Sequence, residues 1–185
     1  MRKIIISLVV ALLVSGCITR PWTPTSSEKD YVAAEQNVSV RLPDGWMIRG
    51  RKDILLLTRD GLLLQNVMVE TIGIDDELNY TKKKFKRGMS PLEQAEVILD
   101  NLASSPNINA FKVLNKKPAE IDGHQAFRAE VSYKDGDGLL YKGVMYGFMQ
   151  NNWFYLVRYV APNRFYFSRD EAKFEKIVKS LKLLV

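Results

Sequence analysis

The sequence predicts an α+β domain: an antiparallel sheet of about seven or eight strands in hairpins, with two amphipathic helices packed on it. Short segments of alternating apolar and polar residues follow one another, with Asp-Gly turns between several of them. Two Ser-x-x-Glu motifs each precede an amphipathic stripe. The strands come in runs instead of alternating with helices, which argues against a parallel sheet.

Composition agrees with one globular domain. The chain has 185 residues, of which 46% are hydrophobic and 26% are charged. These values exclude a disordered, collagen-like or polytopic membrane protein. A chain of this length can bury about 70% of its unfolded surface, so it needs no disulfide or metal to hold a core.

The N-terminus has the pattern of a secretory signal. Arg2 and Lys3 precede an apolar run over residues 4–14, and small residues follow. The run is shorter than the roughly 20 residues of a spanning helix. We therefore assign residues 1–16 to a signal peptide.

The string Val14-Ser15-Gly16-Cys17 resembles the lipobox of bacterial lipoproteins. The resemblance implies lipidation of the Cys17 thiol, cleavage after Gly16 and acylation of the new amine, with palmitate-type chains as a membrane anchor. Ile18 follows where the family's inner-membrane members carry Asp, which implies the outer membrane of a Gram-negative host. The alternative is a plain secreted protein with a coincidental Cys.

The segment after the anchor is rich in Thr, Ser, Pro and charge and has no apolar period. We expect residues 17–37 to form a flexible lipidated tether and residues 38–185 to form a single α+β domain. Loss of Arg2 and Lys3 with the signal lowers the formal net charge from +6 by two. A modest charge on an exported protein does not favour a nucleic-acid partner.

The first half of the domain is predicted to hold strands near residues 38–42, 53–58 and 62–72. Pro43-Asp44-Gly45 makes a turn toward Trp46, and Asp60-Gly61 has the pattern of a two-residue hairpin turn. Later strands are expected near 111–117, 124–133, 139–149 and 153–160, separated by short turns. Consecutive hairpins of this kind predict an antiparallel meander.

Two helices are predicted from capping boxes. Ser90 and Glu93 surround Pro91 at the start of the first helix, which Ser104-Ser105-Pro106 ends. Ser168 and Glu171 have the same spacing at the start of a terminal helix. The expected buried stripes are Leu92, Ala95, Ile98, Leu99 and Leu102 in the first, and Phe174, Ile177, Val178, Leu181 and Leu184 in the second.

Several of these segments together resemble the PsbP/DcrB-like group of envelope and thylakoid-lumen proteins. The resembling segments are residues 40–46 (Val-Arg-Leu-Pro-Asp-Gly-Trp), Ile121-Asp122-Gly123 before a long hairpin, Tyr159-Val160-Ala161-Pro162, and the last helix with Phe174 and Ser180-Leu181. The resemblance covers residues 38–185. It implies a non-catalytic, partner-binding or accessory role.

Catalytic and metal-binding patterns are weak. His124 is the only histidine and follows a turn, so it is expected at a solvated edge. Asp135 and Asp137 alternate with glycines as in a calcium loop, but Tyr146 stands where an EF-hand Glu would be, which favours a plain turn. We therefore predict no catalytic residue, no metal site and no cofactor.

A cationic cluster is the most distinctive charged feature. Lys82, Lys83, Lys84, Lys86 and Arg87 lie within six residues of one another. They are candidates to bind an anionic lipid or an acidic envelope protein. The alternative is a solvated loop balanced by the acidic residues 75–77.

Aromatic residues are dense in the last predicted strand. Trp153, Tyr155 and Tyr159 share one face by alternation and are candidates for an aromatic binding patch if that face is open. If a helix covers it, they belong to the core.

These observations favour a bacterial cell-envelope lipoprotein that is a non-catalytic binding or accessory module. The alternative is an envelope enzyme that acts on lipid or cell-wall material with a carboxylate such as Asp75 or Glu77. The oligomeric state stays open.

Overall fold

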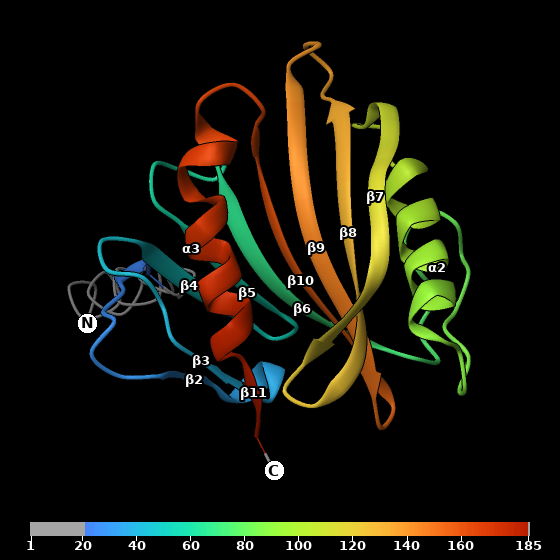
Figure 1. Cartoon of the computed structure of the whole chain (residues 1–185), viewed down its shortest axis with the longest axis horizontal. Coiled ribbons are helices and arrows are strands. Elements are labelled where there is room, and N and C mark those ends of the chain that lie inside the picture. Colours follow the sequence, from blue (N-terminus) through green and yellow to red (C-terminus); the bar gives the residue numbers. More distant parts are fainter. Residues whose placement is uncertain (1–20, 185) are drawn as a thin grey trace, which may run out of the picture.

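The computed structural model describes residues 21–184, which form two antiparallel sheets and two α-helices (Figure 1). The main sheet has eight strands in the order β1-β4-β5-β6-β10-β9-β8-β7. Its strands are β1 (Thr23–Pro24), β4 (Met47–Arg51), β5 (Ile54–Thr58), β6 (Asn66–Gly73), β7 (Asn109–Ile121), β8 (His124–Lys134), β9 (Leu140–Gln150) and β10 (Trp153–Pro162). The small sheet has the order β11-β3-β2 and consists of β2 (Tyr31–Ala33), β3 (Val38–Val40) and β11 (Lys182–Leu183). The predicted fold class and strand number agree with this architecture.

One face of the main sheet is covered by helix α3 (Tyr166–Ser180), which crosses the front of the sheet in Figure 1. We call it the α3 face. Phe174 and Ile177 of the helix are buried there against Val67 and Val157 of the sheet, and Val38 of the small sheet joins the same cluster. Helix and small sheet together close this side.

The opposite face is covered by helix α2 (Pro91–Ala103) only at one end. We call it the α2 face. The helix packs on β7, β8 and β9, so Ala95 and Ile98 are buried against Phe127 and Met145. Figure 1 shows α2 beside β7, far from β4 and β5. The α2 face of β5 and β6 therefore lies beyond the helix.

Local signals were confirmed where the chain forms the meander and starts α2. Strands β7 to β10 are neighbours in sequence order. Ile121 pairs with His124 across a two-residue turn in which Asp122 and Gly123 both have positive φ. Ser90 caps α2 with a complete capping box, because its hydroxyl accepts the Glu93 N–H and the Glu93 carboxylate accepts the Ser90 N–H.

The predicted tether needs correction. Thr23 and Pro24 pair with Ile48 and Met47 of β4, and Tyr31–Ala33 pairs with β3. The Gln36 side chain is buried and donates to two backbone carbonyls. Residues 23–36 therefore belong to the folded domain, because backbone pairing compensates for their lack of an apolar period.

The first half differs from the predictions in three places. The Asp60-Gly61 pair does not make a two-residue hairpin, because β6 begins only at Asn66 and Gln65 is buried, where its side chain bonds the end of β5. The predicted strand at 38–42 joins the small sheet as β3 instead of the main one. Strand β4 was missed, because the segment Met-Ile-Arg-Gly-Arg has almost no alternation.

Helix α3 begins two residues before the predicted cap. Its N-cap is Phe165, at a φ of 70°, and no side chain caps the helix. The Tyr159 hydroxyl lies 2.8 Å from the carbonyl of Tyr166, and the buried Phe167 ring stacks on Tyr159. Tertiary contacts thus set the start, and the Ser168 prediction was wrong. The helix ends at Ser180, so Leu184 lies beyond it.

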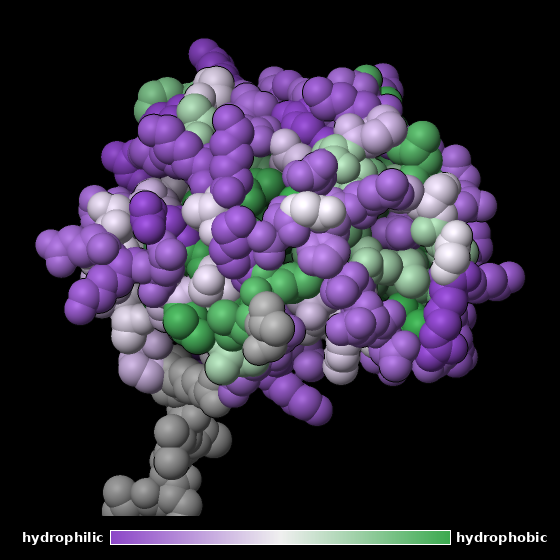
Figure 2. All heavy atoms as spheres, turned by 60° about the horizontal axis from the view of Figure 1, so that its bottom comes forward, coloured by the Kyte–Doolittle hydropathy of each residue, from purple (hydrophilic) through white to green (hydrophobic). Residues whose placement is uncertain are grey.

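Much of the surface is hydrophilic. Figure 2 brings the C-terminal end of the molecule forward and shows small hydrophobic patches separated by hydrophilic side chains. Within the described residues no helix is long and apolar enough to cross a membrane. In this view the surface has no broad apolar face that could form a binding surface.

Candidate functional site

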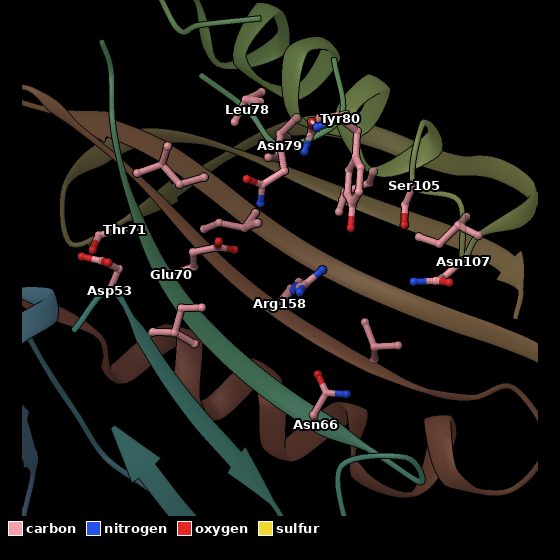
Figure 3. A pocket seen from close by; sticks show the side chains of 18 of the residues that line it. Asp53, Asn66, Glu70, Thr71, Leu78, Asn79, Tyr80, Ser105, Asn107 and Arg158 are labelled. Carbon is pink, nitrogen blue, oxygen red and sulfur yellow. Dashed lines mark hydrogen bonds between the residues drawn. The ribbon is translucent and has the colours of Figure 1, made fainter. Parts of the chain in front are cut away.

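A groove of about 740 Å³ lies on the part of the α2 face that the helix leaves uncovered. Its floor consists of β5, β6 and β10. One wall is formed by residues 76–80 and by α2 with the turn that follows it. Figure 3 shows side chains from floor and wall pointing into the same space. The volume is in the range of small-molecule and short-peptide sites.

Strand alternation puts two opposite charges on the floor of this groove. Val67 and Val69 of β6 point to the α3 face, so Asn66 and Glu70 point to the groove. Arg158 of β10 is paired in register with Met68 and projects the same way. Figure 3 shows Glu70 and Arg158 directed toward Asn79 and Tyr80 of the wall.

The two floor charges are poorly satisfied by the protein. The buried Nε of Arg158 has no hydrogen-bond partner within the described residues, and a terminal nitrogen lies 3.2 Å from the weakly accepting sulfur of Met68. Among residues 21–184, the side chain of Glu70 takes part in no hydrogen bond or ion pair, although its backbone pairs with both neighbouring strands. Burial raises the pKa of Glu70, although the Arg158 charge opposes this effect. Such groups favour a ligand that supplies the missing partners.

The wall is fixed by the buried side chain of Asn101 in α2. Its Oδ1 accepts the backbone N–H groups of Tyr80 and Thr81, at 2.9 and 3.2 Å. Leu78 is buried beside Ile98, so the segment before the cationic cluster is tied to the helix. The wall therefore stands in place before any ligand binds.

The predicted cationic cluster lies outside the groove and is partly used by the fold. Phe85 in its middle is buried and stacks on Phe154 at 4.1 Å between ring centroids. Lys83 forms an ion pair with Asp100 at 2.7 Å, and Arg87 donates to Asn152. The charges of Lys82, Lys84 and Lys86 are exposed to solvent.

The predicted aromatic patch divides between core and surface. Tyr155 and Tyr159 are buried on the α3 face, so for them the core alternative is correct. Trp153 is 45% exposed and lines the groove at one end. An open aromatic surface is thus limited to one residue of the three.

The remaining candidates have local roles. Asp135 Oδ1 accepts the N–H groups of Asp137 and Leu139, as expected for a turn. His124 stacks on Phe148. Asp75 is exposed, and Glu77 lies at the groove rim. Cys17 lies outside the described residues. Within them, no three His, Cys, Asp or Glu side chains are grouped as a metal site.

Sequence reasoning missed Glu70 and Arg158. A signal was present, because each is a lone charge inside a strand of otherwise apolar and uncharged residues. Charged residues inside such strands are rarely buried without a partner. Only the structure shows that these two residues line an open groove, because α2 leaves this part of the sheet uncovered.

The chain was compared with known proteins. No protein-family model matches it, and no curated protein matches it by sequence. Solved structures match its fold. The cyanobacterial PsbP of Synechocystis (CyanoP) has 12% identity and a TM-score of 0.59, with 84% of this chain and 91% of that chain covered.

Two further structures are similar. The Ran-binding protein Mog1p of Saccharomyces cerevisiae has 8% identity and a TM-score of 0.57, with coverage of 84% and 95%. LpqN of Mycobacterium tuberculosis, described as involved in cell envelope biogenesis, has 11% identity and a TM-score of 0.50, with coverage of 88% and 90%. At these identities the likeness shows a PsbP-like fold and nothing about activity.

Proposed function

We propose that this chain is a lipid-anchored binding module of the bacterial cell envelope, and that its groove holds a ligand without changing it chemically. The observation that carries the proposal is the pair of floor groups. A guanidinium with an unsatisfied buried Nε and a carboxylate that has no hydrogen-bond partner among residues 21–184 share one open groove. Leaving such groups unpartnered is costly unless a ligand or solvent satisfies them.

The anchor rests on the sequence pattern at Cys17. The lipobox predicts diacylglyceryl attachment there, and Ile18 favours the outer membrane. LpqN, with the same fold, is described as involved in cell envelope biogenesis. These observations support an envelope location.

A direct test compares the wild-type chain with Cys17→Ser. We expect metabolic labelling with a fatty-acid analogue to mark only the wild type, and the variant to leave the membrane fraction. Equal labelling of both chains contradicts the anchor.

Binding, not catalysis, is favoured by the chemistry of the groove. It is lined by Asn66, Asn79 and Asn107, whose amides recognise polar groups but are weak acids and bases. No nucleophile paired with a histidine base stands there, because His124, the only histidine, does not line the groove.

The function is tested in cells by photocrosslinking. Leu63 lines the groove and is 84% exposed, so Leu63→p-benzoylphenylalanine preserves the fold. Lys176, exposed on α3, is the matched control position. We expect a specific product from position 63, reduced by Arg158→Gln, and none from position 176. Equal products from both positions, or none from position 63, contradict a groove ligand.

The cationic cluster offers a second, membrane-facing contact. Lys82, Lys84 and Lys86 are exposed and are proposed to bind anionic lipid. Their joint replacement by Gln is expected to weaken binding to phosphatidylglycerol vesicles, and the loss should shrink as salt rises. Binding that does not change at low salt contradicts this contact.

An enzyme remains the second candidate because burial raises the pKa of Glu70, as in many general acids. We place this alternative at Glu70, because Asp75 and Glu77 are exposed. Incubation with purified envelope lipid and cell-wall fragments tests it. A product made by the wild type and not by Glu70→Gln would replace the binding proposal.

A further inference from the structure

The groove has a charge opposite to that of the whole chain. Five carboxylates line it, against two cations, Lys52 and Arg158, whereas the chain has a formal net charge of +6. Three of these carboxylates, Asp53, Asp76 and Glu77, surround the end near Glu70. Figure 3 shows Asp53 at that end. An acidic groove on a basic protein attracts a cationic ligand and repels an anionic one.

Glu70 and Arg158 also define a spacing. Glu70 is paired with Leu156, two residues before Arg158 on the neighbouring strand. The two groups are therefore separated by about 6.8 Å along the strands, twice the rise of one extended residue. They form no ion pair or hydrogen bond with each other, although the charge of Arg158 acts on Glu70, and both line the groove.

An extended peptide matches this spacing. Alternate residues of an extended chain present their N–H and C=O groups on the same edge, which repeats at about 6.8 Å. A peptide laid along β6 and β10 can place a carbonyl at the Arg158 guanidinium and an N–H at the Glu70 carboxylate, two residues apart. Ligands with one charged headgroup satisfy only one of the two.

The walls suit the side chains of such a peptide. Leu102 and Ile98 of α2 line one wall, and Leu62 lines the opposite rim. These surfaces accept apolar side chains.

We infer that the groove binds an extended peptide segment that alternates basic and apolar residues, with its backbone held by Arg158 and Glu70. This inference rests on the proposed function, because it names the ligand class of the same groove. An anionic lipid fits less well, since the acidic rim repels its headgroup and amide side chains interrupt the apolar walls.

The test uses the full chain in detergent and a fluorescein-labelled, amidated hexapeptide of alternating Lys and Leu. Fluorescence anisotropy measures its dissociation constant. The comparison peptides are the Glu-Leu hexapeptide and the Lys-Leu hexapeptide with alternate backbone nitrogens methylated. We expect binding of the first peptide only, with a loss of about tenfold or more on methylation, the equivalent of one charge-assisted hydrogen bond.

Matched variants locate the binding. Arg158→Gln is expected to weaken it about tenfold, whereas Arg164→Gln, an exposed arginine outside the groove, leaves it unchanged. Glu77→Gln is expected to weaken it severalfold at low salt, and Glu120→Gln, on exposed β7, is its control. Glu77 is exposed, so this arm remains informative if Arg158→Gln impairs folding.

Three results would overturn the inference. Equal binding of the methylated peptide would mean that charge attraction alone holds the peptide, without backbone hydrogen bonds. Unchanged binding by Arg158→Gln and Glu77→Gln would place the peptide elsewhere. Binding of phosphatidylglycerol vesicles that depends on Arg158, without peptide binding, would assign the groove to lipid. A position-63 crosslink in cells without peptide binding rejects the peptide class but preserves the proposed function, whereas loss of both rejects both.

Discussion

The two faces of the main sheet each hold a carboxylate that is shielded from water, fully at Asp170 and partly at Glu70, but they surround it differently. On the α3 face, Asp170 has no exposed surface and accepts hydrogen bonds from Lys173, Arg169 and Gln65, at 2.6 to 3.3 Å. On the α2 face, Glu70 has no such partner within residues 21–184. The carboxylate of Asp170 stabilises the fold through its hydrogen bonds, whereas the carboxylate of Glu70 is available to bind a ligand.

Their pKa values express the same contrast. Burial by itself raises the pKa of Asp170, but hydrogen bonds and charges from Lys173 and Arg169 outweigh it and hold the pKa below its ordinary value. Burial raises the pKa of Glu70, and the nearby charge of Arg158 offsets only part of this rise. On the closed α3 face the protein itself satisfies the buried carboxylate. On the partly open α2 face we expect a ligand to supply the hydrogen bonds that the protein does not.

The largest expected loss of stability comes from a substitution in the core of the α3 face. Phe174 is fully buried and stacks on Tyr159 at 5.7 Å between ring centroids. We expect Phe174→Ala to cost about 3–5 kcal/mol of unfolding free energy, because the cavity forms where helix and sheet meet. Urea unfolding measures it. Leu63→Ala, on the groove rim, is the control, and a similar loss there would contradict the difference between the faces.

The next effect concerns Asp170. We expect Asp170→Asn to cost about 2 kcal/mol at pH 7, because the surrounding cations lose their acceptor. A folded pKa below 3.8 means that the ionised carboxylate contributes stability above that value and loses it as the pH falls through the folded pKa. The difference between wild type and variant should therefore shrink below about pH 4. A constant difference down to pH 3 in chemical unfolding would contradict this assignment.

The two Ser-x-x-Glu motifs sharpen the comparison of the helices. Ser90→Ala is expected to cost about 1 kcal/mol, because α2 loses its cap. Ser168→Ala should cost less than about 0.5 kcal/mol, because Ser168 lies inside α3 and is exposed. Thermal unfolding of the two variants gives the result. Equal losses would mean that Ser168 stabilises α3 after all.

The smallest effect is expected at Glu70. Glu70→Gln should leave stability within about 0.5 kcal/mol of the wild type at pH 7, or raise it. A raised folded pKa means that the charged carboxylate disfavours folding above that pKa, and that stability is gained as the pH falls toward 4.5. The variant lacks this gain, which melting curves between pH 7 and pH 5 detect. A clear destabilisation at pH 7 would give Glu70 a structural role.

Local chemistry decided which elements could be predicted. The Asp122-Gly123 turn and the Ser90 cap were predictable, because their geometry depends on residues within four positions. The Asp60-Gly61 turn failed because buried Gln65 reaches back to bond Arg59, and the Ser168 cap failed because Phe167 enters the core. The groove was beyond prediction, since it depends on where α2 lies relative to β5 and β6.

The pairing of β1 with β4 limits how high the domain can stand above a membrane. Six residue steps separate Cys17 from Thr23, the first residue of β1, and a chain segment of that length spans at most about 21 Å. If Cys17 carries the lipid as proposed, the β1 edge of the sheet is held within that distance of the bilayer surface. The domain then stays close to the membrane, and its ligand must reach the membrane surface to bind. It does not extend into the space between the membrane and the cell wall.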